Sequence, residues 1–351
     1  MAAGDSPSGA TIVIPTTMRR ETLGPVVETA LAAVSERDGE VILVANGAKE
    51  GRRRLELRSP NLRVLECATP RTGAARNIGL GEAANDLVIF TDDDCLVSPE
   101  WVARISRRLA GGAAAVATSL KMRRDGPITT FIDYQRIFEP PPIDAETVHF
   151  AIGASIAVRR DLITAVFDED IPAGDDVLFG ASLSDAGLPT IYAADAPPPL
   201  HLVPERLESV TERFFRYGTS NAKVLLEKGR VASAIPYARG MYRAICRNEV
   251  EAPRRFEEMA DPNVREAFAA LDVCAAGSVL AGYLDAAGRV LGTELVRLDP
   301  EGLEAGWTEV ERRLSEFVWD GDWHELPLDF DGWRRPHVTR RAALAPMIAE
   351  N

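Results

Sequence analysis

Three consecutive aspartates, Asp92, Asp93 and Asp94, come directly after an apolar run that reads as a β-strand, DLVIFT at residues 86–91. Like charges this close repel one another and raise one another's pKa unless a positive charge lies among them. A metal ion, a basic side chain or solvent could meet that need, and carboxylate oxygens are ligands that Mg²⁺ and Mn²⁺ prefer. The alternative is that the aspartates cap a helix expected to begin near Pro99.

The elements that position these aspartates are strands alternating with helices. Strand-like runs lie at residues 10–17, 40–46, 62–68, 86–91 and 113–120, and helix-like runs lie at 21–35, 73–84 and 99–109. This alternation predicts an α/β fold with a mostly parallel, doubly wound sheet. Ligands bind such a sheet beyond the carboxyl ends of its strands.

Other polar residues fall at the same strand ends as the aspartates. Pro15, Thr16 and Thr17 end the first strand, and Asn46 ends the second. The first turn lacks the GxGxxG pattern of a dinucleotide-binding fold, and the chain contains no GxxxxGK[ST] phosphate loop. A Rossmann dehydrogenase and a P-loop nucleotidase are therefore disfavoured.

The pattern changes in the second part of the chain. Residues 128–148 have no period that predicts an element, a strand is expected at 149–158, and a helix is expected from Asp175. A further strand is expected at 189–195, and the sequence is then almost entirely helical from 207 to about 318. The first nine residues are expected to be flexible.

Composition limits the class of partner and the compartment. The chain of 351 residues has 40 Lys and Arg against 53 Asp and Glu, a net charge of −13, which argues against nucleic acid as a partner. Its four cysteines form no CxxC pair, as expected for a cytoplasmic protein without a zinc or disulfide framework. No signal peptide or integral membrane segment is indicated.

The order of the motifs is more informative than any one of them. IPTT, an NG pair, TGAARNIGL, FTDDDC, GASIAV, AGDDVL and IYAADAPPPLH follow one another in the chain. This order resembles the inverting GT-A glycosyltransferases of family 2 over about residues 10–230. The resemblance implies a Rossmann-like GT-A domain at 10–206, with a nucleotide-sugar half at 10–120 and an acceptor half at 121–206. Residues 207–351 would be a mainly helical C-terminal region.

The resemblance also implies a nucleoside-diphosphate sugar as donor and Mn²⁺ or Mg²⁺ as cofactor. Asp92 would face the nucleotide ribose, and Asp94 and His201 would hold the metal ion. Arg76 would bind the donor phosphates, unless it is a solvated helix residue, and Gly153 would allow close approach of the substrates. The donor site would be completed by Pro15, Thr16, Thr17, Asn46 and Asp93, of which Asp93 is expected to be the least sensitive to mutation.

Catalysis would fall to a pair of aspartates in the motif AGDDVL. The resemblance assigns Asp176 as the base that removes the acceptor proton, with Asp175 in the place of the usual glutamate. Both also suit a helix N-cap. His201 could likewise be an exposed loop residue rather than a ligand.

One position departs from the family. The family's aspartate before the NG pair is Ala45 here, so the nucleotide base would be recognised by other groups, such as the Thr16 and Thr17 hydroxyls. Two alternatives therefore accompany the glycosyltransferase: an inactive relative that binds a nucleotide or a protein, and a sugar nucleotidyltransferase. The acceptor, which residues 131–149 would help to position, is unidentified, and a homodimer is left open.

Overall fold

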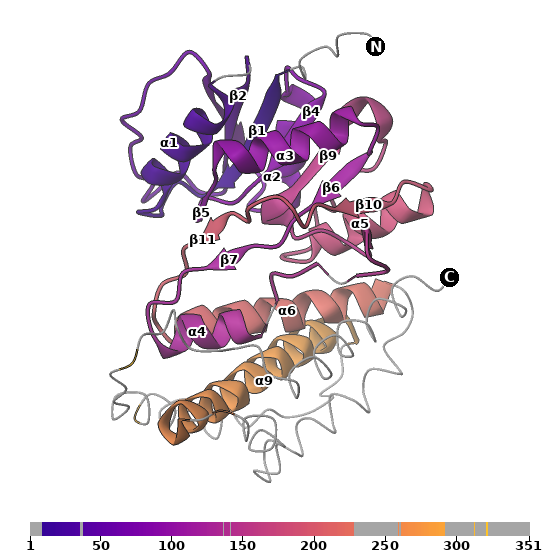
Figure 1. The fold of residues 1–351 in the computed structure, drawn as a ribbon. Coiled ribbons are helices and arrows are strands. Elements are labelled where there is room, and N and C mark those ends of the chain that lie inside the picture. The colour runs from indigo at the N-terminus through magenta and orange to yellow at the C-terminus, as the bar shows by residue number, and fades with distance from the viewer. Residues whose placement is uncertain are drawn as a thin grey trace. The chain divides into compact units, whose positions relative to one another are not determined.

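A computed structural model describes residues 9–35, 38–135, 137–140, 142–227, 259, 261–291, 312 and 321 (Figure 1). Its strands are β1 (Ala10–Thr16), β2 (Glu40–Asn46), β3 (Leu62–Cys67), β4 (Leu87–Phe90), β5 (Cys95–Leu96), β6 (Ala115–Ala117), β7 (Lys121–Met122), β8 (Thr147–Val148), β9 (Ile156–Arg159), β10 (Thr190–Tyr192) and β11 (Leu200–His201). Its helices are α1 (Leu23–Val34), α2 (Thr72–Glu82), α3 (Pro99–Ala110), α4 (Pro127–Tyr134), α5 (Asp175–Asp185), α6 (Glu208–Glu227) and α9 (Pro262–Leu291).

Within the described residues, the larger sheet has eight strands in the order β3-β2-β1-β4-β9-β6-β10-β8. Its first four strands run parallel, with Val13 of β1 opposite Ile42 of β2 and Phe90 of β4. Strand β9 lies between β4 and β6 and is antiparallel to both. The predicted α/β fold with a mostly parallel sheet is confirmed. Among the described strands, β9 and β8 depart from the parallel direction, since β8 is antiparallel to β10.

Helices cover both faces of this sheet because its central strands are apolar on both sides. On one face, Ile12, Ile14 and Leu43 pack with residues of α1 and α3. On the other face, Val13 and Ile42 pack with residues of α2 and α5. The doubly wound arrangement follows directly from the continuous β-branched runs of β1 and β2.

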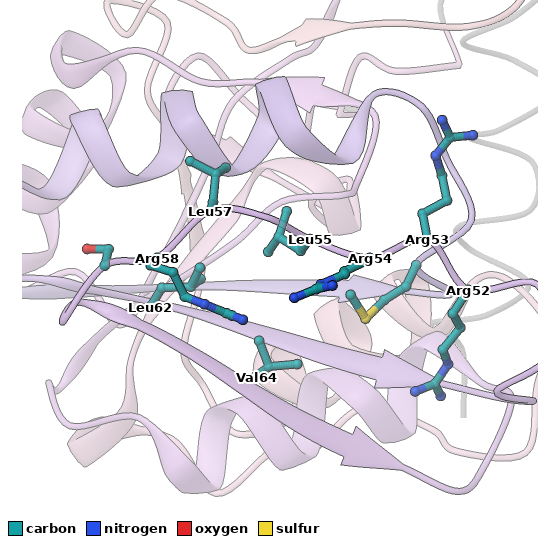
Figure 2. Close-up of a pocket in the computed structure, with 10 residues that line it drawn as sticks. Arg52, Arg53, Arg54, Leu55, Leu57, Arg58, Leu62 and Val64 are labelled. Carbon is teal, nitrogen blue, oxygen red and sulfur yellow. The ribbon is translucent and has the colours of Figure 1, made fainter.

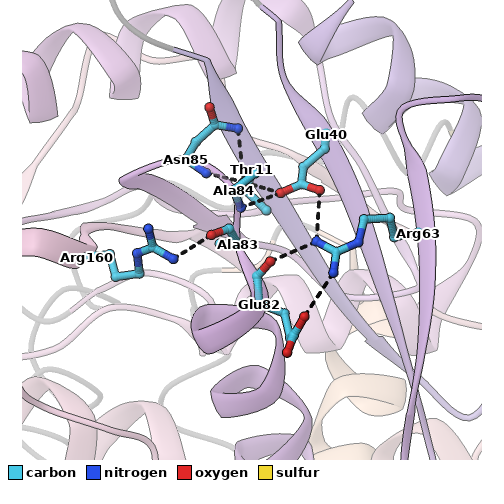
Figure 3. A network of polar contacts seen from close by, with 8 residues as sticks. All are labelled: Thr11, Glu40, Arg63, Glu82, Ala83, Ala84, Asn85 and Arg160. Carbon is cyan, nitrogen blue, oxygen red and sulfur yellow. Dashed lines mark hydrogen bonds and ion pairs between the residues drawn. The ribbon is translucent and has the colours of Figure 1, made fainter.

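A polar network closes the edge of the sheet at which β1 and β2 begin (Figure 3). Glu40 accepts hydrogen bonds from the Thr11 hydroxyl at 3.0 Å and from the Ala84 N–H at 2.6 Å. Arg63 donates to the Glu82 carbonyl, and Arg160 donates to the Ala83 carbonyl, so carbonyl groups at the end of α2 have partners. These bonds fix α2 against the sheet and leave the opposite, carboxyl edge for a ligand.

The chain divides into two compact units. The first contains residues 1–122, 137–171 and 175–202, and the second contains 123–136, 172–174 and 203–351. In the second unit α6 and α9 approach so closely that a Cβ on Gly282 would lie 2.0 Å from the Phe215 carbonyl oxygen. Glu205 caps α4 by accepting hydrogen bonds from the Ile128 and Thr129 N–H groups. Among the described helices, none is long and apolar enough to cross a membrane.

Two secondary-structure expectations need correction. The strand expected at 149–158 begins only at Ile156, because Gly153–Ser155 form a short 3₁₀ turn. The stretch 128–148, for which no element was expected, contains most of α4 and the short strand β8. The described parts of the expected helical region are α6 and α9. The first eight residues and nearly all of the chain after 291 lie outside the described residues.

Candidate functional site

The three aspartates lie where the carboxyl ends of neighbouring strands meet. Strands β2, β1 and β4 are adjacent and parallel, so the residues that follow β1 and β4 share one edge of the sheet. The Thr16 hydroxyl at the end of β1 donates to Asp93 Oδ2 at 2.7 Å, and the Thr22 hydroxyl donates to the Asp93 carbonyl at 2.8 Å. The two turns are thereby joined into one site.

Capping of α3 does not explain the aspartates. The N-cap of α3 is Ser98, whose hydroxyl accepts the Trp101 N–H at 3.1 Å, and Pro99 occupies the first turn. Trp101 is buried and donates through Nε1 to the Thr118 hydroxyl at 3.0 Å, so the helix is well anchored. The capping alternative for Asp92, Asp93 and Asp94 is therefore excluded.

Arg20 supplies positive charge to two of the three aspartates. Its Nε lies 2.8 Å from Asp93 Oδ1, and its Nη1 lies 3.0 Å from Asp94 Oδ2. Burial by itself lowers the pKa of Arg20, but the carboxylates of Asp94, Asp93 and Asp92 outweigh it, and the pKa is raised. Arg20 is not among the site residues expected from the sequence, where its signal is a basic residue in the turn after the first strand.

The three aspartates are not equivalent. The side chain of Asp92 is 37% exposed, whereas those of Asp93 and Asp94 are 10% and 5% exposed. Burial raises the pKa of Asp93 to about 7, although Arg20 and the Thr16 hydroxyl oppose this. Asp93 is thus a buried part of the turn, and we expect its loss to lower the stability of the site.

Arg76 joins the triplet to the second pair of aspartates. Its Nη2 donates to Asp92 Oδ1 at 2.9 Å, and its Nη1 donates to Asp175 Oδ2 at 2.6 Å. The side chain is only 4% exposed and lies 5.4 Å from the centre of the Phe167 ring. The alternative of a solvated helix residue is excluded. Nε of Arg76 is buried and, among the described residues, has no hydrogen-bond partner.

The environment of Arg76 holds it charged. Burial alone lowers its pKa, but the carboxylates of Asp175, Asp92 and Asp176 outweigh this and raise it. Burial also raises the pKa of the Asp175 carboxyl to about 6, although the charge of Arg76 lowers this pKa. Gly73 allows α2 to come close enough for the contact between Arg76 and Asp175. A Cβ on Gly73 would lie 2.0 Å from the Asp168 carbonyl oxygen.

Asp176 lies in the first turn of α5, beside Gly153. Its Oδ2 accepts the Gly153 N–H at 2.8 Å, and its Oδ1 accepts the Val177 N–H at 2.9 Å. The side chain is half-buried, in contrast to the buried Asp175. The predicted pair therefore divides into a carboxylate that holds Arg76 and one that is open to a ligand.

His201 lies on the other side of the triplet from Arg76, in register with Cys95. Strands β11 and β5 are antiparallel, and His201 Nε2 lies 3.3 Å from Asp94 Oδ1. The ring is buried against Phe138, and its Nδ1 has no hydrogen-bond partner among the described residues. The alternative of an exposed loop histidine is excluded.

These residues suit a hard divalent cation. Ligand atoms of Asp94, Cys95 and His201 all lie within 4.8 Å of one another. Burial raises the pKa of the Cys95 thiol well above its usual value, so the thiol stays protonated and is a poor ligand. A carboxylate and an imidazole remain, and Arg20 already places a cationic group against Asp94. Cys95 was not foreseen, because only the β5–β11 pairing brings it to His201.

The remaining predicted residues are less closely involved. The Thr16 hydroxyl donates to Asp93 and accepts the Met18 N–H at 2.8 Å, so its proton is not available for a nucleotide base. Thr17 is exposed, and Asn46 is buried with no partner for its Oδ1 among the described residues. Pro15 is buried within β1.

A comparison with known families concerns the first part of the chain. The family described as "Glycosyl transferase family 2" matches residues 11–167. These residues form a family 2 glycosyltransferase domain. Over these residues the family resemblance and the enzyme class expected from the sequence are confirmed. The matched residues of this glycosyltransferase include the triplet, Arg76 and Gly153, whereas Asp175, Asp176 and His201 lie beyond them.

Solved structures similar to the glycosyltransferase have low sequence identity. Glucosyl-3-phosphoglycerate synthase from Mycobacterium tuberculosis, in complex with Mn²⁺, uridine diphosphate and phosphoglyceric acid, is 18% identical, with 62% of this chain and 78% of that chain covered and a TM-score of 0.43. S. aureus TarS 1-349 in complex with UDP-GlcNAc is 12% identical, with 81% and 92% covered and a TM-score of 0.41. No curated protein matches the chain.

Substitution of Gly153 tests how tightly this site is packed. A Cβ at Gly153 would lie 2.5 Å from Nη2 of Arg76, which two carboxylates hold in place. We expect Gly153→Ala to lower the free energy of unfolding by about 1–3 kcal/mol, as measured by urea denaturation. Gly81→Ala is the control, because no atom lies within 4 Å of its Cβ position. Equal stability of Gly153→Ala and the wild type would contradict the packing described.

Proposed function

We propose that the protein transfers a sugar from a nucleoside-diphosphate sugar to an acceptor hydroxyl, with inversion at the anomeric carbon and with the help of a divalent metal ion. One observation carries the proposal. Asp94, two residues after Asp92, contacts His201, and Arg76 links Asp92 to Asp175. We assign Asp94 and His201 to the metal side of the site and the Asp175–Asp176 pair to the base side. A donor needs the first side for its diphosphate and the second for its reacting carbon.

The metal-binding residues would be Asp94 and His201. A carboxylate oxygen and a neutral imidazole nitrogen are suitable ligands for Mn²⁺, and Mg²⁺ would rely on the carboxylate and on phosphate oxygens. When bound, the ion would supply positive charge that stabilises the departing diphosphate. Arg20 already contacts Asp93 and Asp94, so the ion would share the Asp94 carboxylate with it.

Binding and orientation of the donor would fall to the chain's own residues around Asp92. Asp92 is the most exposed member of the triplet, so its carboxylate can accept hydrogen bonds from ribose hydroxyls. Arg76 fixes the orientation of that carboxylate through the 2.9 Å hydrogen bond from its Nη2 to Asp92 Oδ1. We therefore assign Arg76 first to positioning Asp92 and Asp175, with any contact to the donor phosphates as an addition.

Asp176 would act as the general base. It would accept the proton of the acceptor hydroxyl while that oxygen forms a bond to the anomeric carbon. The bond from this carbon to the diphosphate oxygen would break, and its electron pair would leave with the nucleoside diphosphate. The Gly153 and Val177 N–H groups orient the carboxylate, and Asp175 keeps Arg76 in place beside it.

The competing functions predict different products. A sugar nucleotidyltransferase would release pyrophosphate from a nucleoside triphosphate, but its phosphate-binding turn would require glycines where this chain has PTTMRR. An inactive relative would bind a nucleotide without turnover. Nothing in the contacts of Asp94, Asp176 or His201 suggests a site that has lost its chemistry.

A donor panel separates these functions. We expect at least one nucleoside-diphosphate sugar to release nucleoside diphosphate with Mn²⁺ or Mg²⁺ and not with EDTA, and the freed or transferred sugar to have the anomeric configuration opposite to that of the donor. Chromatography of the nucleotides and ¹H NMR of the sugar measure the two results. Pyrophosphate release, or tight nucleotide binding with no turnover of any donor, would exclude the proposal.

A further inference from the structure

A cavity lies beneath the segment that joins β2 to β3, and its lining includes Met18 in the turn after β1. Its volume is about 370 Å³, within the range of small-molecule sites. Residues 52–59 of this segment form neither helix nor strand and run over β3, which is an edge strand of the sheet. The cavity is lined by Met18, Arg52, Arg53, Arg54, Leu55, Leu57, Arg58, Ser59, Leu62 and Val64.

The cavity has an apolar wall. Leu55 and Leu57 alternate with charged residues along the segment and, with Leu62 and Met18, pack against the core on that face of the sheet. Val64 lies on the strand below, and its side chain is 49% exposed. An apolar group in the cavity would cover it.

Two of the four arginines that line the cavity have partners within the protein. Arg52 pairs with Glu66 at 2.9 Å and donates to the Gly47 carbonyl at 2.9 Å. Arg53 lies 3.3 Å from Glu21, and Figure 2 shows its side chain turned away from the space between Leu55 and Val64. These two arginines have roles in holding the segment in place.

Arg54 and Arg58 are different. Neither has a hydrogen-bond or ion-pair partner among the residues that the structure describes, and no acidic residue lines the cavity. Figure 2 shows both guanidinium groups turned into the space between Leu55 and Val64. Both arginines are exposed, and an anion between their two guanidinium groups would be attracted by both charges. A phosphate, with several oxygens and more than one negative charge, matches two guanidinium groups.

The cavity is separate from the sugar site. Val64 lies opposite Leu43, whereas the strand-end residue Asn46 lies opposite Cys67, three residues further along β3. At about 3.3 Å per residue this places Val64 about 10 Å from the carboxyl edge of the sheet.

We propose that this cavity binds a small organic phosphate with an apolar group, its phosphate between Arg54 and Arg58 and its apolar part against Leu55, Leu57 and Val64. The volume of about 370 Å³ matches one small molecule. The proposal is independent of sugar transfer, because it involves no residue of the triplet, of the Asp175–Asp176 pair or of the candidate metal site.

Octyl phosphate, below its micelle concentration, is the probe. In isothermal titration of the full chain, without metal or nucleotide, we expect one molecule to bind per chain. Both octanol and inorganic phosphate alone should bind at least tenfold more weakly. The double variant Arg54→Ala/Arg58→Ala should lose at least tenfold in affinity. The charge-matched control Arg107→Ala/Arg108→Ala should keep the wild-type affinity, because both residues are exposed on α3 and neither lines the cavity.

A second variant keeps the arginines and changes the wall. Val64→Ser should weaken octyl phosphate severalfold and leave inorganic phosphate unchanged, and the exposure of Val64 makes this change tolerable for the fold. Equal affinity of the wild type and Arg54→Ala/Arg58→Ala for octyl phosphate would overturn the proposal. So would binding only to vesicles of phosphatidic acid in phosphatidylcholine, since that outcome would indicate a membrane surface.

Discussion

Replacement of Asp176 by asparagine is expected to lower sugar transfer by about 100- to 10,000-fold while leaving donor binding nearly unchanged. An amide has no basicity to remove the acceptor proton, but it keeps the size of the carboxylate. It can also keep one of the two hydrogen bonds from the Gly153 and Val177 N–H groups. Release of nucleoside diphosphate measures transfer, and calorimetric titration measures donor affinity.

The control for this prediction is on the same helix. Asp185 is exposed at the last position of α5, so Asp185→Asn removes the same charge without touching the site. It should retain wild-type transfer. If Asp176→Asn loses donor affinity in parallel with transfer, Asp176 binds the donor and does not serve as the base.

Replacement of Asp94 by asparagine should lower sugar transfer by a similar factor, because it weakens binding of the metal ion. Asp94 is buried, lies 3.3 Å from His201 Nε2 and holds Arg20 at 3.0 Å, so its charge is the centre of the proposed cation site. Loss of even a supporting contact to a metal ligand typically costs about 10- to 100-fold in affinity, and loss of the ligand should cost at least as much. Titration of Mn²⁺ in the presence of nucleoside diphosphate, together with the release assay, measures both effects.

Asp93→Asn provides the contrast within the triplet. Asp93 accepts hydrogen bonds from Thr16 and pairs with Arg20, but it does not lie beside His201. We expect a smaller loss of Mn²⁺ affinity than in Asp94→Asn and a larger loss of thermal stability than in surface variants. Mn²⁺ affinity retained in Asp94→Asn and lost in Asp93→Asn would reverse the two assignments.

Much of the fold could be predicted from local sequence patterns. The strands β1, β2 and β4 are continuous apolar runs, and their parallel pairing follows from the helices between them. Prediction failed at residues 149–155, where apolar residues suggested a strand but Gly153 lies in a 3₁₀ turn against Arg76. A tertiary contact with a residue of α2 decided the local structure there.

The triplet could be located from sequence, whereas its partners could not. Arg19 and Arg20 are adjacent in the chain, yet Arg20 pairs with the aspartates and Arg19 donates to the Glu50 carbonyl. The direction of each side chain depends on the turn at Met18, which has a positive φ of 59°. The contact of Arg76 with Asp175 spans 99 residues and depends on the packing of α2 and α5. The roles of all these residues in transfer stay predictions.

The most direct test of the central claim is thermal melting of the wild type with a panel of nucleoside-diphosphate sugars, each with and without Mn²⁺. A ligand at 100 times its dissociation constant stabilises the folded state by about 2.7 kcal/mol, which is readily measured. If the strand-end aspartates hold a metal ion and a donor diphosphate together, at least one donor will raise the melting temperature strongly with Mn²⁺ and hardly at all with EDTA. An equal rise with and without the metal would contradict the account.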